Sequence, residues 1–187
     1  AIAQAQSNRD ARPTVIAIDI DRFRDVNEAI GIPGGDSILL TIARRLLRLV
    51  HLQDTLARIS SDEFAMIIRS ERDPQSLIAI AEAVRKSVLT PIVFNDREIA
   101  VTASIGIALF DSQLHQKRED MLKDGMVATA HAKKSGGNRV EFFRPGMRTQ
   151  HSDRLSLEAD LRRAIDRHEI RVAFRPIVRL EDRTIAG

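Results

Sequence analysis

The alternating segment REIAVTASIGIALF, residues 97–110, constrains the fold more than any other part of the chain. From Ile99 to Leu109 every second residue is apolar, and most of these are large. The residues between them are Ala, Thr, Ser, Gly and Ala. This period of two predicts a β-strand with two different faces. A face of such small side chains lets another element pack very close, most simply a helix.

The other segments alternate between short β-rich runs and amphipathic runs. Further strands are predicted at 13–20, 55–59, 64–68 and 138–143, and helices at 21–31, 34–50, 73–89 and 118–136. The order β-α-α-β-β-α-β-α-β predicts an α/β (α+β) fold, in which helices flank a central, mostly antiparallel sheet.

The character of the chain changes after Pro145-Gly146. A new amphipathic helix is predicted over 152–170 and a strand over 171–180. Because both ends of the sequence stop in mid-pattern, we expect a piece of a longer protein. The expected organisation is an N-terminal linker at 1–13, a first domain at 14–144, a linker at 145–152 and part of a second domain at 153–187.

Composition narrows the function classes. A chain of 187 residues with 43% apolar and 29% charged residues is typical of a globular protein and excludes general disorder. The absence of cysteine excludes disulfides and thiolate metal sites and fits a cytoplasmic location. Seven Phe with no Trp or Tyr argue against a nucleic-acid surface. No apolar run approaches the ~20 residues of a membrane span, so no direct membrane contact is expected.

The stretch RISSDEFAMII, residues 58–68, has two interpretations. Ser60 followed three residues later by Glu63 fits a helix-capping box. Alternatively, the apolar runs on either side are two strands, and Ser60–Glu63 is the turn between them. Local signals leave both open. Only the hairpin would hold the Asp62 and Glu63 carboxylates together on a tight loop.

Other acids follow the first strand. Asp19 and Asp21 lie where that strand ends, which is where ligands bind in many α/β sheets. Asp19 with Asp62 or Glu63 would supply the oxygen ligands that Mg²⁺ prefers. The alternative is that Asp21 caps the next helix and that the other two acids solvate a turn.

Two glycine-rich stretches carry similar alternatives. Asp36 of Gly34-Gly35-Asp36 either caps the following helix or points into a pocket. Lys133 and Lys134 either complement the dipole at a helix end or reach a phosphate group.

In order, DIDRFRDVNEAIGIPGGD, DTLARISSDEF, VTASIGIA and AKKSGGNRV resemble the GGDEF domain of diguanylate cyclases, from Thr14 to Phe143. The tail LEADLRRAIDRHEIRVAFRPIVRLEDRTIAG resembles the opening of an EAL domain, the cyclic di-GMP phosphodiesterase module. The resemblance implies a βααββαβ core like those of nucleotidyl cyclases and polymerase palms, and the hairpin interpretation of 58–68. It also implies a composite GGDEF–EAL signalling protein, cytoplasmic or the cytoplasmic part of a membrane-anchored sensor.

Members of that family condense two GTP into cyclic di-GMP across a homodimer, using Mg²⁺ (or Mn²⁺). The resemblance assigns the metal to Asp19, the carbonyl oxygen of Ile20, Asp62 and Glu63, of which the two turn acids are also the catalytic candidates. It assigns the guanine base to Asn27 and Asp36, and the phosphates to Arg24 and Lys133.

The sequence also departs from the family pattern. Ser60-Ser61 replace Gly-Gly, and Gly137 replaces a phosphate-binding Arg. The serines add side chains to the turn and would strain any position with φ > 0. The product-inhibition motif Arg-x-x-Asp keeps Asp54 but has His51 for Arg. We therefore expect a GTP-binding regulatory domain with little or no cyclase activity, adjacent to an EAL partner. The alternatives are an active cyclase and a dimerisation domain that binds no nucleotide.

Overall fold

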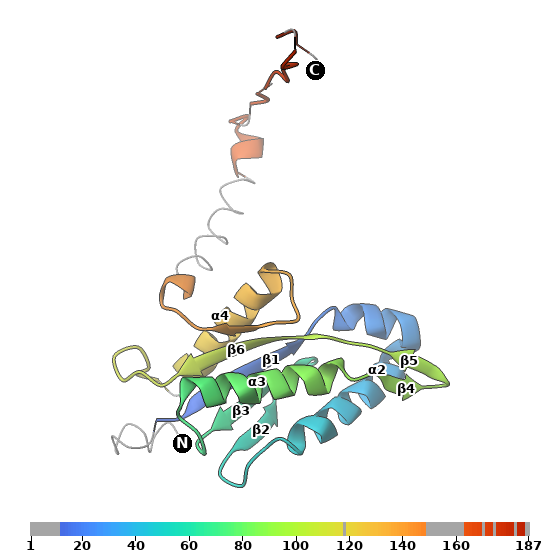
Figure 1. Cartoon of the computed structure of the whole chain (residues 1–187), viewed down its shortest axis with the longest axis vertical. Coiled ribbons are helices and arrows are strands. Elements are labelled where there is room, and N and C mark those ends of the chain that lie inside the picture. Colours follow the sequence, from blue (N-terminus) through green and yellow to red (C-terminus); the bar gives the residue numbers. More distant parts are fainter. Residues whose placement is uncertain are drawn as a thin grey trace. The chain divides into compact units, whose positions relative to one another are not determined.

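The structure is a computed structural model that describes residues 12–117, 119–148, 163–169, 171–173, 175–181 and 183–185. The chain divides into two compact units, Ala1–Arg148 and Thr149–Gly187. The first unit holds the sheet and the helices that pack on it (Figure 1).

A five-stranded sheet forms the centre of the first unit. Its strands are β1 (Thr14–Ile20), β2 (Thr55–Arg58), β3 (Glu63–Ile68), β6 (Ala103–Leu109) and β7 (Val140–Phe142). Their order is β2-β3-β1-β6-β7, and every neighbouring pair is antiparallel except β6–β7. The predicted flanked, mostly antiparallel sheet is therefore confirmed.

Helices cover both faces of the sheet. The helices are α2 (Phe23–Leu47), α3 (Pro74–Leu89) and α4 (Asp120–Lys134). One face carries the large buried side chains, among them Ile16, Ile18 and Ile107, which pack with α2 and α3 in the hydrophobic core. On the opposite face α4 approaches so closely that a Cβ on Gly125 would lie 3.1 Å from the Ala17 side chain. The close helix predicted from the small face of 97–110 is thus α4.

The predicted strand over 97–110 is wrong in its first part. Residues Arg97–Ile99 form β5, which pairs with β4 (Ile92–Phe94) in a separate hairpin, and β6 begins at Ala103. The hairpin turns at Asn95 and Asp96, whose φ angles are 48° and 59°. A two-residue turn of this kind favours Asn and Asp because they tolerate positive φ, so the sequence contained a signal for it.

Two other interpretations are settled by the backbone. The helices predicted at 21–31 and 34–50 form one span, α2, broken at Gly31 by φ 75° and ψ 164°. The stretch 58–68 is a hairpin, because β2 pairs antiparallel with β3 and residues 60–62 lie in the turn. The capping-box interpretation is therefore wrong.

The second unit is described only in part. Residues 163–166 are helical, as predicted, whereas 152–162, the end of the linker and residues 1–11 lie outside the described residues. The strand predicted over 171–180 is not formed by its described residues, which make a single bridge between Val178 and Ile185. Both side chains are substantially exposed. An isolated apolar run without a buried surface to pack on has little to stabilise it as a strand.

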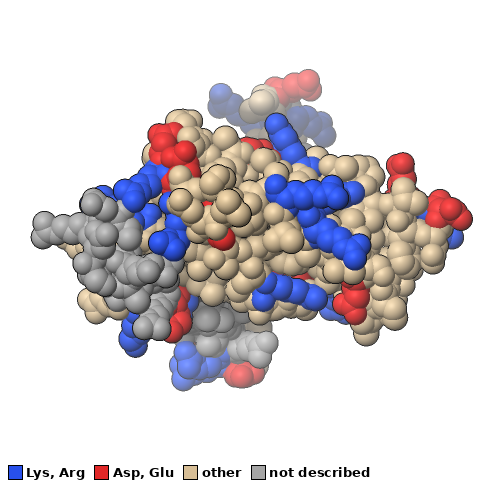
Figure 2. Space-filling view, turned by 90° about the horizontal axis from the view of Figure 1, so that it is seen from below, with Lys and Arg blue, Asp and Glu red and all other residues tan. Residues whose placement is uncertain are grey.

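The surface of the described chain carries both signs of charge. On the face shown in Figure 2, Lys and Arg side chains lie in small groups separated by uncharged surface, with Asp and Glu near them. None of the helices in the described part of the chain is long and apolar enough to cross a membrane.

Candidate functional site

The acids expected at the metal site meet at one end of β1 and β3. Asp19 is the register partner of Glu63 in the antiparallel pair. The backbone N–H of Ile20 donates to the carbonyl oxygen of Asp62 at 3.1 Å. The sheet thus brings together the backbones of Asp19, Ile20, Asp62 and Glu63.

Asp19 is largely buried, with 15% of its side chain exposed. Its Oδ1 lies 2.6 Å from the Lys133 ammonium but is otherwise a buried oxygen without a hydrogen-bond partner. Burial is the largest cause of the raised pKa of Asp19; Lys133 opposes it, and the charges of Asp62 and Glu63 add to it. Loss of solvation on burial, which disfavours the charged form of the carboxyl, thus outweighs the nearby Lys133 ammonium.

The turn acids are held by their own serines. Ser60 Oγ donates to Glu63 Oε2 and Ser61 Oγ donates to Asp62 Oδ1, each at 2.7 Å. Arg58, which sequence reasoning missed, donates to the carbonyl oxygens of both serines at 3.1 and 2.6 Å. Neither serine has a positive φ. The condition for backbone strain at this turn, a positive φ at either serine, is therefore not met.

The fit of a divalent cation can be tested on this arrangement. The donors are oxygens, which suit Mg²⁺ or Mn²⁺, and Asp19 Oδ1 is a buried oxygen whose partner is the Lys133 ammonium at 2.6 Å. In the part of the chain that the structure describes, however, no three Asp, Glu, His or Cys side chains converge as a metal site requires. These residues are of the types that bind a divalent cation, and their backbones lie close together. Their side chains are instead paired with Lys133, Ser60 and Ser61.

A cavity of about 550 Å³ lies between α2 and the β2–β3 hairpin. It is lined by Asp36, Leu39, Leu40, Ala43, Leu56, Arg58 and Phe64. Asn27 lies against Gly35, the residue before Asp36, where a Cβ would stand 1.9 Å from Asn27 Oδ1. The absence of a side chain at Gly35 makes room for the Asn27 amide. The cavity combines apolar walls with a carboxylate, as a flat heterocyclic base requires.

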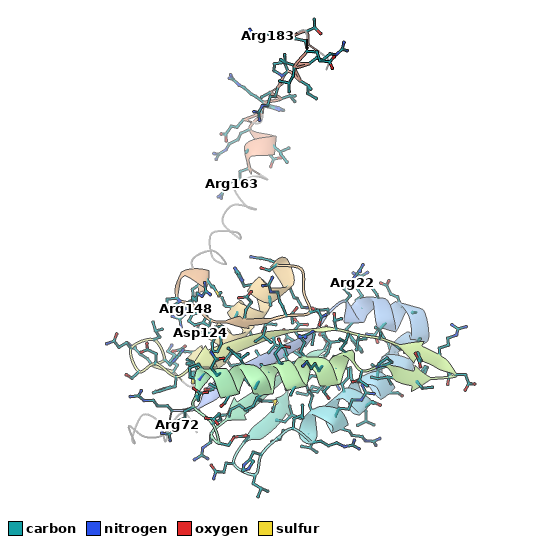
Figure 3. All side chains as sticks on the ribbon, in the orientation of Figure 1. Arg22, Arg72, Asp124, Arg148, Arg163 and Arg183 are labelled. Atoms are coloured by element: carbon teal, nitrogen blue, oxygen red, sulfur yellow. The ribbon has the colours of Figure 1, made fainter. Side chains whose placement is uncertain are left out.

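A second cavity, of about 420 Å³, lies beside Lys133. It is lined by Asp21, Arg22, Thr102, Lys133, Gly136 and Gly137. Arg24, the expected phosphate ligand, instead pairs with Glu28 at 2.8 Å on the exposed side of α2. Arg22, at the start of α2 in Figure 3, lines the cavity in its place and was missed from the sequence.

Asp21 does not cap α2. Its carboxylate accepts hydrogen bonds from Thr102 Oγ1 at 2.7 Å, Ser104 Oγ at 2.6 Å and the Asn138 backbone N–H at 2.9 Å. Three segments distant in sequence are thereby joined at the edge of the second cavity. The Asp21 carboxylate therefore has a structural role, because it holds these segments together.

Asp54 is likewise engaged within the fold. Its carboxylate accepts from the backbone N–H groups of Arg69 and Ser70 at 2.7 and 3.0 Å, and from Ser70 Oγ at 2.7 Å. Partial burial alone would raise the pKa of Asp54, but these hydrogen bonds outweigh it and the pKa is lowered. The carboxylate kept from the inhibition motif thus stabilises the start of the loop between β3 and α3.

We predict that Asp54→Ala lowers the free energy of unfolding by about 2 kcal/mol at pH 7, since three donors lose their acceptor. A depressed folded-state pKa gives stability that is present above the unfolded pKa of ~3.9 and is lost as the pH falls through the folded value. The difference between wild type and variant should therefore shrink below pH 4. Urea unfolding at pH 7 and pH 3 measures it, with Asp25→Ala as an exposed control. A constant difference would contradict the assignment.

A buried ionic group lies at the other end of α4 and was also missed. Asp124 is 1% exposed and accepts from Arg148 Nε and Nη2 at 2.6 and 2.7 Å. It also lies 2.9 Å from Nε2 of the buried His115. Nδ1 of His115 accepts from the Asp111 backbone N–H, so its proton is on Nε2 and is donated to Asp124. Figure 3 shows Asp124 and Arg148 side by side.

Comparison with known proteins gives a consistent family. A model described as diguanylate cyclase, GGDEF domain, matches residues 1–139. MucR of Pseudomonas aeruginosa, a bifunctional diguanylate cyclase/cyclic di-GMP phosphodiesterase, is 35% identical over 169 residues, which are 90% of this chain and 24% of MucR. The cyclic di-GMP phosphodiesterase NbdA from the same organism is 27% identical over 90% of this chain and 21% of its own length. The chain therefore spans about a quarter or less of these relatives.

Solved structures agree. The GGDEF domain of YfiN (TpbB) from Pseudomonas aeruginosa superposes with a TM-score of 0.74 at 26% identity, over 81% of this chain and 88% of that one. An EAL/GGDEF domain protein from M. capsulatus gives a TM-score of 0.67 at 30% identity, over 77% and 94%. The family match, the sheet order and the ordered motifs lead to one conclusion: the chain belongs to the GGDEF (diguanylate cyclase) domain family of cyclic di-GMP signalling proteins.

Proposed function

We propose that the first unit binds GTP and acts as a regulatory GGDEF domain with little or no cyclase activity. The observation that carries this proposal is the pair of cavities. One is lined mainly by apolar side chains together with Asp36, and the other is lined by two cationic side chains, Arg22 and Lys133. Base recognition by Asn27 and Asp36 and phosphate contact by Lys133 are compatible with this arrangement.

The acids carry the second half of the proposal. Asp19, Ile20, Asp62 and Glu63 would hold Mg²⁺ or Mn²⁺, which when bound would stabilise charge on the phosphates. Their side chains are bonded instead to Lys133, Ser60 and Ser61. Carboxylates that are engaged by neighbouring side chains, beside cavities with room for a base and for phosphates, favour binding over turnover.

Similarity to known relatives supports a proposal about the domain organisation of the protein. The name of MucR joins a cyclase and a phosphodiesterase activity in one protein. We propose that the unit after Arg148 begins an EAL partner domain in the same way, that two copies of the first unit meet as a homodimer, and that the protein acts in the cytoplasm.

Calorimetric titration of the purified chain with GTP tests the binding proposal. Asp36→Ala should weaken GTP binding at least tenfold, because a buried donor–acceptor pair with the base is lost. Glu98→Ala, at an exposed position in β5, should leave the affinity unchanged. Absence of any heat with GTP would favour the dimerisation domain, and equal losses in both variants would contradict the assignment of Asp36.

The retained acids keep an active cyclase as the second candidate. Incubation of the same chain with GTP and Mg²⁺, with product separated by chromatography, distinguishes the two. We expect at most traces of cyclic di-GMP. Rapid product formation would replace the regulatory proposal by the active cyclase.

A further inference from the structure

We propose that the hydroxyl groups of Ser60 and Ser61, rather than their added bulk or lost flexibility, are what weakens cation binding at this site. In this view both serines are positioning residues, which act through the carboxylates of Glu63 and Asp62. The inference deepens the proposed function and rests on its assignment of these acids.

The backbone of the β2–β3 turn accommodates both serines. The turn that joins β2 to β3 contains no positive φ at Ser60 or Ser61, so it does not need the conformational freedom of glycine. Arg58 holds the carbonyl oxygens of both residues, and the Ile59 N–H donates to the Glu63 carbonyl oxygen at 2.8 Å. A turn formed in this way accepts alanine as readily as serine.

The hydroxyl groups of both serines are bonded to the turn acids. Hydroxyl-to-carboxylate bonds of 2.7 Å are charge-assisted and stronger than neutral ones. Each takes one oxygen of a turn acid, and Lys133 faces the third acid, Asp19. A cation that binds through these same oxygens has to compete with the hydroxyl and ammonium donors. Because Ser60 and Ser61 are exposed, each bond contributes modestly, and together we expect about a tenfold effect on affinity.

The Ala substitution separates hydroxyl from bulk. Alanine keeps the Cβ atom and removes the hydroxyl, glycine removes both, and threonine keeps both. If hydroxyls are responsible, Ala and Gly behave alike and Thr behaves as the wild type. If bulk or backbone freedom is responsible, only Gly differs from the wild type.

The experiment measures Mn²⁺ affinity by the loss of free-ion electron paramagnetic resonance signal, on the whole 187-residue chain without nucleotide. S60A/S61A and S60G/S61G should both bind Mn²⁺ about tenfold tighter than wild type, with S60T/S61T unchanged. Asp19→Asn in the Ala background should abolish the gain, which places the ion at this site. Circular dichroism and urea unfolding verify that each variant is folded.

Two results would overturn the inference: tighter binding in the Gly pair alone, or no gain in either the Ala or the Gly pair. A separate measurement tests the proposed function itself: titration of the chain with GTP in buffer containing a chelator. A chain that binds no GTP but gains Mn²⁺ affinity in the Ala pair would refute GTP binding and leave the serine assignment standing. A chain that binds GTP but shows no gain would refute the serine assignment alone.

Discussion

Gly106→Ala is expected to destabilise the first unit by about 3 kcal/mol or more, and Gly106→Val to prevent its folding. A Cβ at this position would stand 2.1 Å from the carbonyl oxygen of Gly125 and 2.6 Å from the backbone nitrogen of Thr129. Both are backbone atoms of α4, so no side-chain rotation relieves the contact. The helix would have to move away from β6, which would also loosen its contacts with β1. Urea unfolding followed by circular dichroism at 222 nm measures the loss.

Gly146→Ala is the matched control. A Cβ there meets nothing within 4 Å, and its φ is not in the positive range, so a change below about 0.5 kcal/mol is expected. Equal, small effects at the two glycines would mean that α4 slides on the sheet without cost, and the close approach would then not be a source of stability.

The contrast between these glycines shows what the sequence could predict of the fold. The alternation through residues 103–109 contains the small face, and hence the prediction that a helix lies against it. Periodicity along one strand does not reveal which helix comes, or that Gly125 faces Gly106, because that is a relation between distant segments. The β4–β5 hairpin was missed for a different reason: Arg97–Ile99 continue the apolar alternation of the next strand, and their pairing with Ile92–Phe94 decides otherwise.

The candidate site, like the fold, could be predicted from the sequence only in part. The order of motifs identified Asp19, Asp62 and Glu63 as neighbours, and the register of β1 against β3 confirms that their backbones meet. The partners of those acids could not be predicted. Arg58 contacts the turn through its side chain, which no sequence pattern indicates. Arg22 lines the second cavity, whereas the family pattern pointed to Arg24. Single residues that act across a fold leave no periodic signal in a sequence.

The Asp124 group is the extreme case, since its three members are separated by loops and share no motif. We predict that Asp124→Ala lowers the free energy of unfolding by about 2–3 kcal/mol, because the buried His115 Nε2–H loses its acceptor and Arg148, whose side chain is 42% exposed, loses its ion pair. The Arg148 guanidinium keeps its positive charge in this variant, because an arginine side chain is not deprotonated in proteins, and so it cannot avoid the loss by releasing a proton.

A double-mutant cycle with Arg148→Met isolates the pair. Removing Arg148 alone leaves the Asp124 carboxylate buried with His115 as its remaining donor, so this single change should also be costly. In the double variant Asp124→Ala/Arg148→Met neither charge of the pair remains. Its loss should therefore be smaller than the sum of the two single losses by at least 1 kcal/mol, as measured by urea unfolding. Strict additivity would mean that the two residues act independently. Coupling would mean that Arg148, the last residue of the first unit, anchors the point where the chain leaves that unit to the helix that carries Lys133 at its other end.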